Sequence, residues 1–299
     1  MRIGLVVNPT AGRERAARFH TGVQRQLEHH GHAVVDLTAF DAAGALAKAR
    51  AEVPDLGTLV VVGGDGVVQL GLNAVAGTDV ALGIIPVGSG NDNASGLGLP
   101  SDPRAALDLI VRHLDHDPGG VATDAMRVES AGTRTWAMGT VSCGIDAVVN
   151  ARANAMAWPR GSLRYPVALM GVLPRYRMPT HRVEADDWSW EGRAVLVAAA
   201  NVGWFGGGMH IAPTARPDDG LLDIVIGGDI GPLRLLALFP RIYGGSHVTH
   251  PLVDVRRSRR VTITTDMPRS VYADGEHVGE LPATIEVVPG AVRMLRPRT

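Results

Sequence analysis

The sequence has 299 residues, enough for two domains of ordinary size, each with its own hydrophobic core. Hydrophobic residues make up 45% of it and charged residues 20%, which is normal for a globular protein. The 29 Lys and Arg residues nearly balance the 30 Asp and Glu residues, for a net charge of -1. No field of the whole protein therefore attracts nucleic acid, and we expect no nucleic-acid partner.

Cysteine usage and hydropathy indicate the compartment. The one cysteine, Cys143, excludes an internal disulfide and fits a reducing cytoplasm. The apolar part of the N-terminus is too short for a signal peptide and instead predicts a first strand. No apolar stretch approaches the roughly 20 residues that span a bilayer. We therefore expect a cytoplasmic protein whose membrane contact, if any, is peripheral and on the inner face.

Strand-like and helix-like segments alternate in the first part of the chain. This alternation predicts βα units and a mainly parallel, Rossmann-like sheet. Ligands of such sheets bind beyond the carboxyl ends of the strands, where the glycine-rich turns of this sequence fall. The expected strands are 3–7, 33–37, 59–62 and 80–85, and the expected helices are 15–29, 42–51, one with helical spacing from 67 to 75, and 102–114.

The pattern changes after Gly120, where we place a domain boundary. Short strands separated by turns then predict an antiparallel sandwich. The expected domains are an ATP-binding α/β domain, 1–120, and a β-rich sandwich domain that binds lipid and metal, 121–299, whose last residues can pack back on the first. The expected strands are 125–129, 134–138, 182–185, 193–200, 222–226, 260–264, 271–273 and 284–288, with helices at 163–173 and 232–243.

Two glycine-rich loops follow buried strands. The first, Gly63-Gly64-Asp65-Gly66, joins a β-branched run to a helical pattern, and such a junction favours an anion at the helix N-terminus. Asp65 would repel a bare phosphate, so it suggests a metal ion or a proton-handling role. The second loop places Ser89 between Gly88 and Gly90. Each loop alone is equally typical of an ordinary turn, but together they favour a nucleotide site.

Two acidic turns in the second half are candidates for chemistry. The segment 214–223 holds Asp218, Asp219 and Asp223, and carboxylate and carbonyl oxygens are the ligands that divalent metals prefer. The triplet Asp274-Gly275-Glu276 offers a carboxylate suited to a general base. Solvated hairpin turns explain both segments as well, and the residues alone leave this open.

Three further features have a structural and a lipid-related interpretation. The basic run Arg256–Arg260 is typical of a charged strand edge, and it also suits anionic lipid headgroups. The helix 163–173, flanked by arginines, is expected to be buried, with an interfacial lipid-entry segment as the alternative. Trp204-Phe205 suits core packing or the wall of an acyl cleft.

Taken in order, these motifs resemble the diacylglycerol kinase catalytic-domain family in its bacterial soluble form. The match covers nearly the whole chain. The resemblance implies phosphorylation of a lipid hydroxyl, on diacylglycerol or a related glycerolipid or sphingoid base, with ATP and Mg2+. The motifs are 7–12, 63–66, 85–92 and 97–100, then 206–209, 212–213, 218–223, 244–247 and 274–276 with Pro282.

The resemblance also implies roles for individual residues. Glu276 would take the proton from the acceptor hydroxyl, and Asp65 would organise the magnesium–phosphate network. A further Mg2+ would be held by Asp219 and the backbone carbonyls of Arg216 and Leu221. The ATP site would be lined by Asn8, Pro9, Thr10, Ala11, Gly12, Thr38, Gly63, Gly64, Asp65, Gly66, Val67, Val68, Gln69 and Ser89.

The sequence departs from the family pattern beside the first loop. It has Val67 where the family usually has Thr, Gln69-Leu70 in place of Asn-Glu, and Asn93 in place of Phe. An NAD-kinase-like small-molecule kinase and a non-catalytic nucleotide- or lipid-binding protein therefore remain as alternatives. A lipid substrate at the membrane surface is the expected partner. The oligomeric state stays open, with a homodimer as one option.

Overall fold

The computed structural model describes residues 1–7, 13–156, 158–159 and 164–298. Its contacts divide the chain into two compact units. The first holds Met1–Ala125 and the segment from Pro289 onward, and the second holds Met126–Val288. Two strands, β5 (Val121–Ser130) and β18 (Ala283–Met294), pass from one unit into the other.

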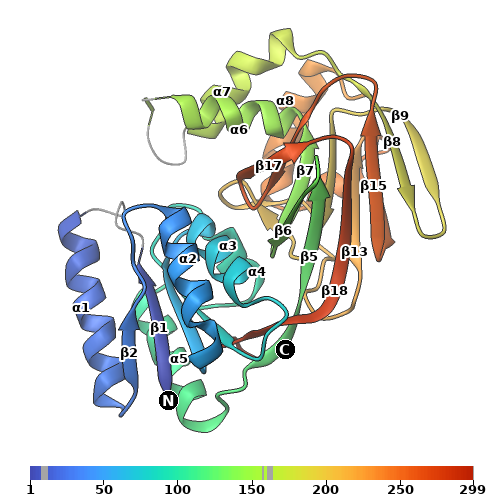
Figure 1. The fold of residues 1–299 in the computed structure, drawn as a ribbon. Helices are drawn as coiled ribbons and strands as arrows, with labels where there is room; N and C mark the ends of the chain where they lie inside the picture. Colours follow the sequence, from blue (N-terminus) through green and yellow to red (C-terminus); the bar gives the residue numbers. More distant parts are fainter. Residues whose placement is uncertain (8–12, 157, 160–163, 299) are drawn as a thin grey trace. The chain divides into compact units, whose positions relative to one another are not determined.

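The first unit is a parallel sheet covered by helices (Figure 1). Its strands lie in the order β2-β1-β3-β4, and the end of β18 adds a parallel partner beside β4. Its elements are β1 (Arg2–Val7), α1 (Arg13–His29), β2 (Ala33–Asp36), α2 (Ala42–Glu52), a 3₁₀ turn (Val53–Asp55), β3 (Thr58–Gly63), α3 (Asp65–Val75), β4 (Ala81–Pro86), α4 (Asp92–Gly96) and α5 (Pro103–His116).

Strand residues of the first unit alternate between two helical layers, because successive side chains of a strand point to opposite faces. On one face, Ile3 and Val60 pack with Leu27 of α1 and Ile110 of α5. On the other face α3 lies close to the sheet: a Cβ added at Gly71 would come 2.7 Å from Cγ1 of Val61. Both faces of the sheet are therefore buried, which explains its near-continuous apolar strands.

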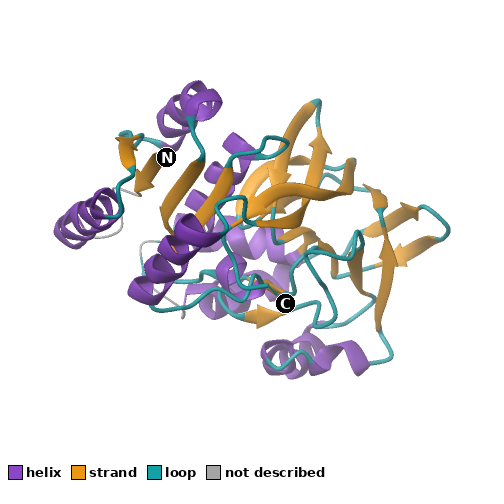
Figure 2. Cartoon of the chain, turned by 90° about the horizontal axis from the view of Figure 1, so that it is seen from below, coloured by secondary structure: helices purple, strands orange, loops and turns teal. Residues whose placement is uncertain are grey.

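The second unit consists mainly of strands (Figure 2). Together with β5 and β18 it comprises β6 (Thr133–Ala137), β7 (Thr140–Gly144), α6 (Ile145–Ala155), α7 (Arg164–Val172), a 3₁₀ turn (Leu173–Arg175), β8 (Thr180–Ala185), β9 (Ser189–Arg193), β10 (Leu196–Ala200), β11 (Trp204–Phe205), β12 (Met209–His210), β13 (Leu222–Gly227), α8 (Pro232–Tyr243), a 3₁₀ turn (Ser246–Thr249), β14 (Val253–Ser258), β15 (Arg260–Thr265), β16 (Ser270–Ala273) and β17 (Glu276–Glu280).

These strands form an antiparallel sandwich. One sheet has the order β14-β13-β10-β7-β16-β17, and the other contains β18-β15-β8-β9 with β5 and β6 at its side. Side chains from both sheets share one core, for example Val141 and Ile224 of the first sheet and Val183 and Ile285 of the second. A second core lies under α6, α7 and α8. Among the described residues, no helix is both long and apolar enough to cross a membrane.

The predicted fold class, a mostly parallel α/β domain followed by an antiparallel β sandwich, is confirmed. One predicted strand is wrong. The segment 193–200 is not continuous, because β9 pairs with β8 in one sheet whereas β10 pairs with β7 and β13 in the other. The chain changes sheets at Ala194 and Val195, which hydrogen-bond to Pro179 and Gly227 instead of continuing either ladder.

Several short elements were not predicted. The strands β7, β14 and β17 and the helices α4 and α6 have no counterpart among the expected elements, and α3 begins at Asp65, before the expected Val67. The expectation of little helix after the boundary is therefore wrong for the region that contains α6. The start of α6 depends on Gly144. This residue has a φ of 138°, and a Cβ added there would lie too close to Val195, so a side chain has no room.

Candidate active site

The two glycine-rich loops of the first unit lie against each other. The first follows β3 and the second follows β4, and these strands are parallel neighbours. A Cβ added at Gly88 would come 2.5 Å from the Cα of Gly64, so the two backbones approach more closely than any side chain would allow. The second loop is closed by Asn91, whose side chain accepts from the N–H of Gly88 at 3.0 Å and donates to its carbonyl at 2.9 Å.

Asp65 joins the first loop to α4. One carboxylate oxygen accepts the backbone N–H of Asn93 at 2.9 Å, and the other accepts that of Asp92 at 3.2 Å. Burial raises the pKa of Asp65, while these backbone N–H groups lower it. These hydrogen bonds of the Asp65 carboxylate therefore fix the relative position of the two loops, independently of any role in binding a metal ion.

The other residues predicted for ATP lie at the carboxyl edge of the same sheet. Thr38 follows β2, and its hydroxyl oxygen accepts the N–H of Val7 at the end of β1, at 3.1 Å. Ser89 is exposed. Along α3, Gly66 is exposed and Val67 half-buried, whereas Val68 and Gln69 are buried. The remaining predicted ATP residues, Asn8, Pro9, Thr10, Ala11 and Gly12, lie outside the described residues.

In the second unit, Glu276 follows a tight hairpin turn between β16 and β17. Asp274 and Gly275 form the turn with φ angles of 51° and 87°, the left-handed conformations that a two-residue hairpin requires. Glu276 itself is exposed. The predicted base therefore stands at a defined position on the surface of the sandwich.

A carboxylate holds this turn in place. Asp274 accepts three backbone N–H groups, from Met138 and Gly139 at 2.8 Å and from Thr140 at 3.1 Å. Its own N–H donates to the carbonyl of Thr140. From another side, Asn150 of α6 donates to the carbonyl of Gly275 at 3.3 Å. The triplet 274–276 signalled the turn, but nothing local in the sequence predicted these partners.

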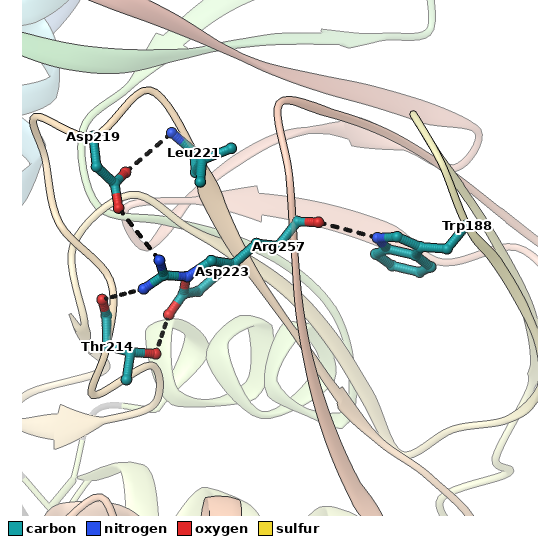
Figure 3. A network of polar contacts seen from close by, with 6 residues as sticks. All are labelled: Trp188, Thr214, Asp219, Leu221, Asp223 and Arg257. Carbon is teal, nitrogen blue, oxygen red and sulfur yellow. Dashed lines mark hydrogen bonds and ion pairs between the residues drawn. The ribbon is translucent and has the colours of Figure 1, made fainter.

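The second acidic turn is built around Arg257 of β14 (Figure 3). The guanidinium donates to the buried carboxylate of Asp223 at 2.9 Å and to the carbonyl of Thr214 at 3.1 Å. Asp223 also accepts the hydroxyl of Thr214. Asp219 accepts the N–H of Leu221 at 3.0 Å and lies 3.7 Å from Arg257. Arg257 therefore contacts both ends of the turn, Thr214 and Asp223, as well as Asp219 between them.

The predicted magnesium ligands lie in this turn. Asp219, Arg216 and Leu221 offer a carboxylate and two backbone carbonyls, hard oxygen donors of the kind that Mg2+ prefers. The carboxylate side chain of Asp219 is 26% exposed, so water can complete a coordination shell. The described residues contain no group of three or more His, Cys, Asp or Glu side chains arranged for a metal ion. The donor set therefore fits Mg2+ only if backbone oxygens and water supplement the single carboxylate of Asp219.

The basic run Arg256–Arg260 is engaged with neighbouring carboxylates. Arg256 pairs with Asp254 at 2.8 Å and lies over the ring of Trp188, and Arg257 belongs to the acidic turn. The backbone N–H groups of Arg259 and Arg260 donate to Asp186. This arrangement agrees with a strand edge.

An apolar cavity lies between the sandwich and its helices. Its volume is about 60 Å³, and it is lined by α6, α7, α8 and β13. Leu169, Leu235 and Phe239 contribute to its wall, and so does Phe205, which the sequence suggested for an acyl cleft. The helix expected near this position is α7 (Arg164–Val172), which packs as a core element on one side while it lines the cavity.

Comparison with known proteins places these features in a family. A family model described as "Diacylglycerol kinase catalytic domain" matches residues 2–118, and one described as "YegS C-terminal NAD kinase beta sandwich-like domain" matches residues 139–296. A diacylglycerol kinase of Mycobacterium tuberculosis is 40% identical, over 99% of this chain and 96% of its own length. The chain belongs to the diacylglycerol kinase family.

A further relative and two solved structures are also similar to this chain. A YegS-like lipid kinase of Stenotrophomonas maltophilia is 30% identical, over 83% of this chain and 82% of its own length. The solved structure of a diacylglycerol kinase from Bacillus anthracis covers 99% of this chain and 97% of its own, with a TM-score of 0.72 and 20% identity. An NAD kinase of Archaeoglobus fulgidus has a TM-score of 0.54 at 16% identity, which shows a shared fold alone. The chain is thus a kinase of a lipid kinase family.

Proposed function

We propose that this kinase transfers the γ-phosphoryl group of ATP to the hydroxyl of a lipid, in a reaction that requires Mg2+. ATP would bind at the glycine-rich loops of the first unit, where backbone N–H groups and the start of α3 favour phosphate. Glu276 would accept the proton of the attacking hydroxyl, because an alcohol is a poor nucleophile until a base removes its proton.

The observation that carries the proposal is the position of α6. The first turn of this helix lines the apolar cavity through Ile145 and Asp146. One turn later, Asn150 donates to Gly275 in the turn that precedes Glu276. A single helix therefore links an apolar cavity with the carboxylate suited to a hydroxyl. This pairing matches an amphiphilic acceptor better than a soluble one such as NAD.

Mg2+ would supply positive charge that offsets the charge of the transferring phosphoryl group. Asp65 is the predicted residue nearest the phosphate loops, and its hydrogen bonds to Asp92 and Asn93 already orient its carboxylate. The turn with Asp219 and the carbonyls of Arg216 and Leu221 would hold a further ion. Arg257 fixes that turn, so we expect it to keep the oxygens in place before a metal binds.

Contact with a membrane surface, on the cytoplasmic side, is part of the proposal. Exposed apolar side chains occur on each helix beside the cavity: Val148 on α6, Met170 on α7, and Leu233 on α8, which is 84% exposed. Trp158, before α7, is 80% exposed. Apolar side chains at this exposure favour contact with a lipid interface, from which the acceptor would be taken.

The decisive experiment replaces Glu276 by Gln, which keeps the shape of the side chain and removes the base. We expect transfer from labelled ATP to a total lipid extract to fall by at least a hundredfold, with the Kd for ATP unchanged. Glu280→Gln, on the same hairpin and equally exposed, is the matched control and should keep wild-type turnover.

Three outcomes would count against the proposal. Retained turnover in Glu276→Gln would remove this residue from its role as base. Labelling of NAD but of no lipid by the wild-type protein would assign the chain to soluble acceptors. ATP binding with transfer to neither acceptor would favour a non-catalytic protein, the alternative raised by Val67, Gln69 and Leu70.

A further inference from the structure

The loop between β2 and α2 presents the most exposed of the large apolar side chains in the described part of the chain. Phe40 lies in this loop and is 97% exposed, whereas Leu37 at its start is buried. The ring of Phe40 therefore adds nothing to the core of the first unit. A single exposed apolar residue is common on protein surfaces, so the rigidity and the position of this loop decide what Phe40 does.

Hydrogen bonds hold the loop on both sides of Phe40. Before it, the carbonyl oxygen of Thr38 accepts the ammonium group of Lys48 on α2 at 2.9 Å. After it, the carboxylate of Asp41 caps α2 by accepting the N–H of Gly44 at 2.7 Å. The backbone on each side of the ring is thus ordered before any ligand binds. This order reduces the entropy that a contact with the ring would cost.

Phe40 lies beyond the same edge of the sheet as the glycine-rich loops. Asp36, the last residue of β2, is aligned through Leu5 of β1 with Val60 of β3. Phe40 comes four residues after Asp36, and Gly64 comes four residues after Val60. The strands β2 and β3 flank β1, so about 10 Å separates them. The ring and the first glycine-rich loop therefore leave the sheet at the same level, two strand spacings apart.

We propose that Phe40 is a specificity-determining residue for the donor nucleotide, and that its ring stacks on the base of ATP while the glycine-rich loops hold the phosphates. The inference rests on the ATP site of the proposed function and deepens it by assigning the base subsite. The ribose separates the base of a nucleotide from its phosphates, so a platform for the base belongs beside the phosphate loops and not among them. An aromatic ring suits this task, because every base has a π face on which it can stack.

The charges around the ring favour a nucleotide base over a membrane surface. Two exposed carboxylates, Asp36 and Asp41, flank Phe40 in the loop. They would repel the anionic headgroups of a cytoplasmic leaflet. The base is the uncharged end of a nucleotide, so it can contact the ring without meeting this repulsion.

Calorimetric titrations with ATP and with inorganic tripolyphosphate, both with Mg2+, test the proposal without any lipid. The two ligands share three phosphates, but only ATP has a base. Phe40→Ala should raise the Kd for ATP about tenfold and leave the Kd for tripolyphosphate unchanged. His116→Ala, which removes another exposed ring of the first unit at the end of α5, is the control and should change neither Kd.

Fluorescence tests whether the base contacts the ring. All five tryptophans of the sequence belong to the second unit, so Phe40→Trp introduces the first tryptophan of the first unit. The indole keeps an aromatic face, and this variant should therefore bind ATP with about the wild-type affinity. ATP should quench its emission beyond any quenching in the wild-type protein, and tripolyphosphate should not.

Four results would overturn the proposal. They are an unchanged Kd for ATP in Phe40→Ala, equal losses of affinity for ATP and tripolyphosphate in that variant, and no additional quenching in Phe40→Trp. The fourth is a loss of sedimentation with phosphatidylglycerol vesicles in Phe40→Ala at an unchanged Kd for ATP, which would assign the ring to a membrane surface.

The outcome is distinguishable from that of the proposed function. ATP binding that depends on Phe40, in a protein that labels no lipid, would support the base subsite and reject the lipid kinase reaction. Lipid labelling that depends on Glu276, with a Kd for ATP that is independent of Phe40, would do the reverse. In the kinase assay, Phe40→Ala should raise the KM for ATP about tenfold and keep the wild-type kcat at saturating ATP.

Discussion

The turn that presents Glu276 depends on Asp274, and Asp274→Asn tests that dependence. The carboxylate accepts one backbone N–H on Oδ2, from Met138, and two on Oδ1, from Gly139 and Thr140. Asn tolerates the left-handed conformation of this position, so the backbone is not strained by the change. Its amide can still accept the two N–H groups with its oxygen, but its NH2 group then faces the N–H of Met138.

The expected loss of stability in Asp274→Asn follows from the number of hydrogen bonds that the change removes or weakens. Met138 is fully buried, so water does not replace the lost partner. Losing one hydrogen bond to a charged acceptor and weakening two more should lower the free energy of unfolding by about 2–4 kcal/mol. A domain of ordinary stability survives such a loss. The turn would shift, however, and a displacement of about 1 Å at a catalytic group can lower turnover by about a hundredfold.

The assay combines urea unfolding with steady-state kinetics. We expect Asp274→Asn to unfold at lower urea, to lose at least tenfold in kcat and to keep the wild-type Kd for ATP, since the predicted ATP residues belong to the other unit. Asp187→Asn, at an exposed position, is the control and should change neither quantity. Wild-type stability and kcat in Asp274→Asn would refute the positioning role.

Two further predictions concern buried charge and pH. His181 is fully buried, neither of its ring nitrogens has a hydrogen-bond partner within the described part of the chain, and burial lowers its pKa to about 4. The unfolded chain therefore binds the extra proton, and the free energy of unfolding should fall by up to about 3 kcal/mol as the pH drops from 6.5 to 4. Urea melts across this range check it, and His181→Phe with an unchanged slope would contradict it. Arg257→Met should destabilise the protein by about 2–3 kcal/mol, because it removes the charged partner of the buried Asp223 carboxylate and keeps its hydrogen bond from the hydroxyl of Thr214. In urea melts, Arg257→Met combined with Asp223→Leu should recover part of that loss, and strict additivity of the two changes would count against the ion pair.

The features that the sequence predicted are those with local causes. The loop at Gly63 and Gly64 was recognisable because a β-branched strand, a glycine turn and a helical pattern follow one another within a few residues. The turn at Asp274 and Gly275 has an equally local signal, although the residues alone left open whether it is a hairpin turn and did not predict β17. The change from βα units to short strands predicted the fold class for the same reason, since hydrophobic period alone distinguishes the two halves.

The features that the sequence did not predict depend on contacts between distant residues. Asp274 and the N–H groups that it accepts are more than 130 positions apart. The start of α6 depends on Gly144 packing against Val195, and neither residue is unusual in its local sequence. The hydrogen bond from Ser142 to the buried carboxylate of Asp146 becomes apparent only once β7 and α6 are in place. Such residues combine ordinary local composition with a position that the tertiary structure alone defines.

One structural device recurs beside both predicted catalytic carboxylates, Asp65 and Glu276. In each unit an aspartate beside a glycine turn accepts backbone N–H groups of a separate loop: Asp65 those of Asp92 and Asn93, and Asp274 those of 138–140. For Asp65 this resolves an apparent conflict, because a free carboxylate at a phosphate loop would repel the ligand. With both oxygens accepting N–H groups, its charge is partly offset. Asp65 can then fix the loop geometry and still attract a cation. In the second unit the two roles are divided, because Asp274 holds the turn while the exposed carboxylate of Glu276 is available to act as the base.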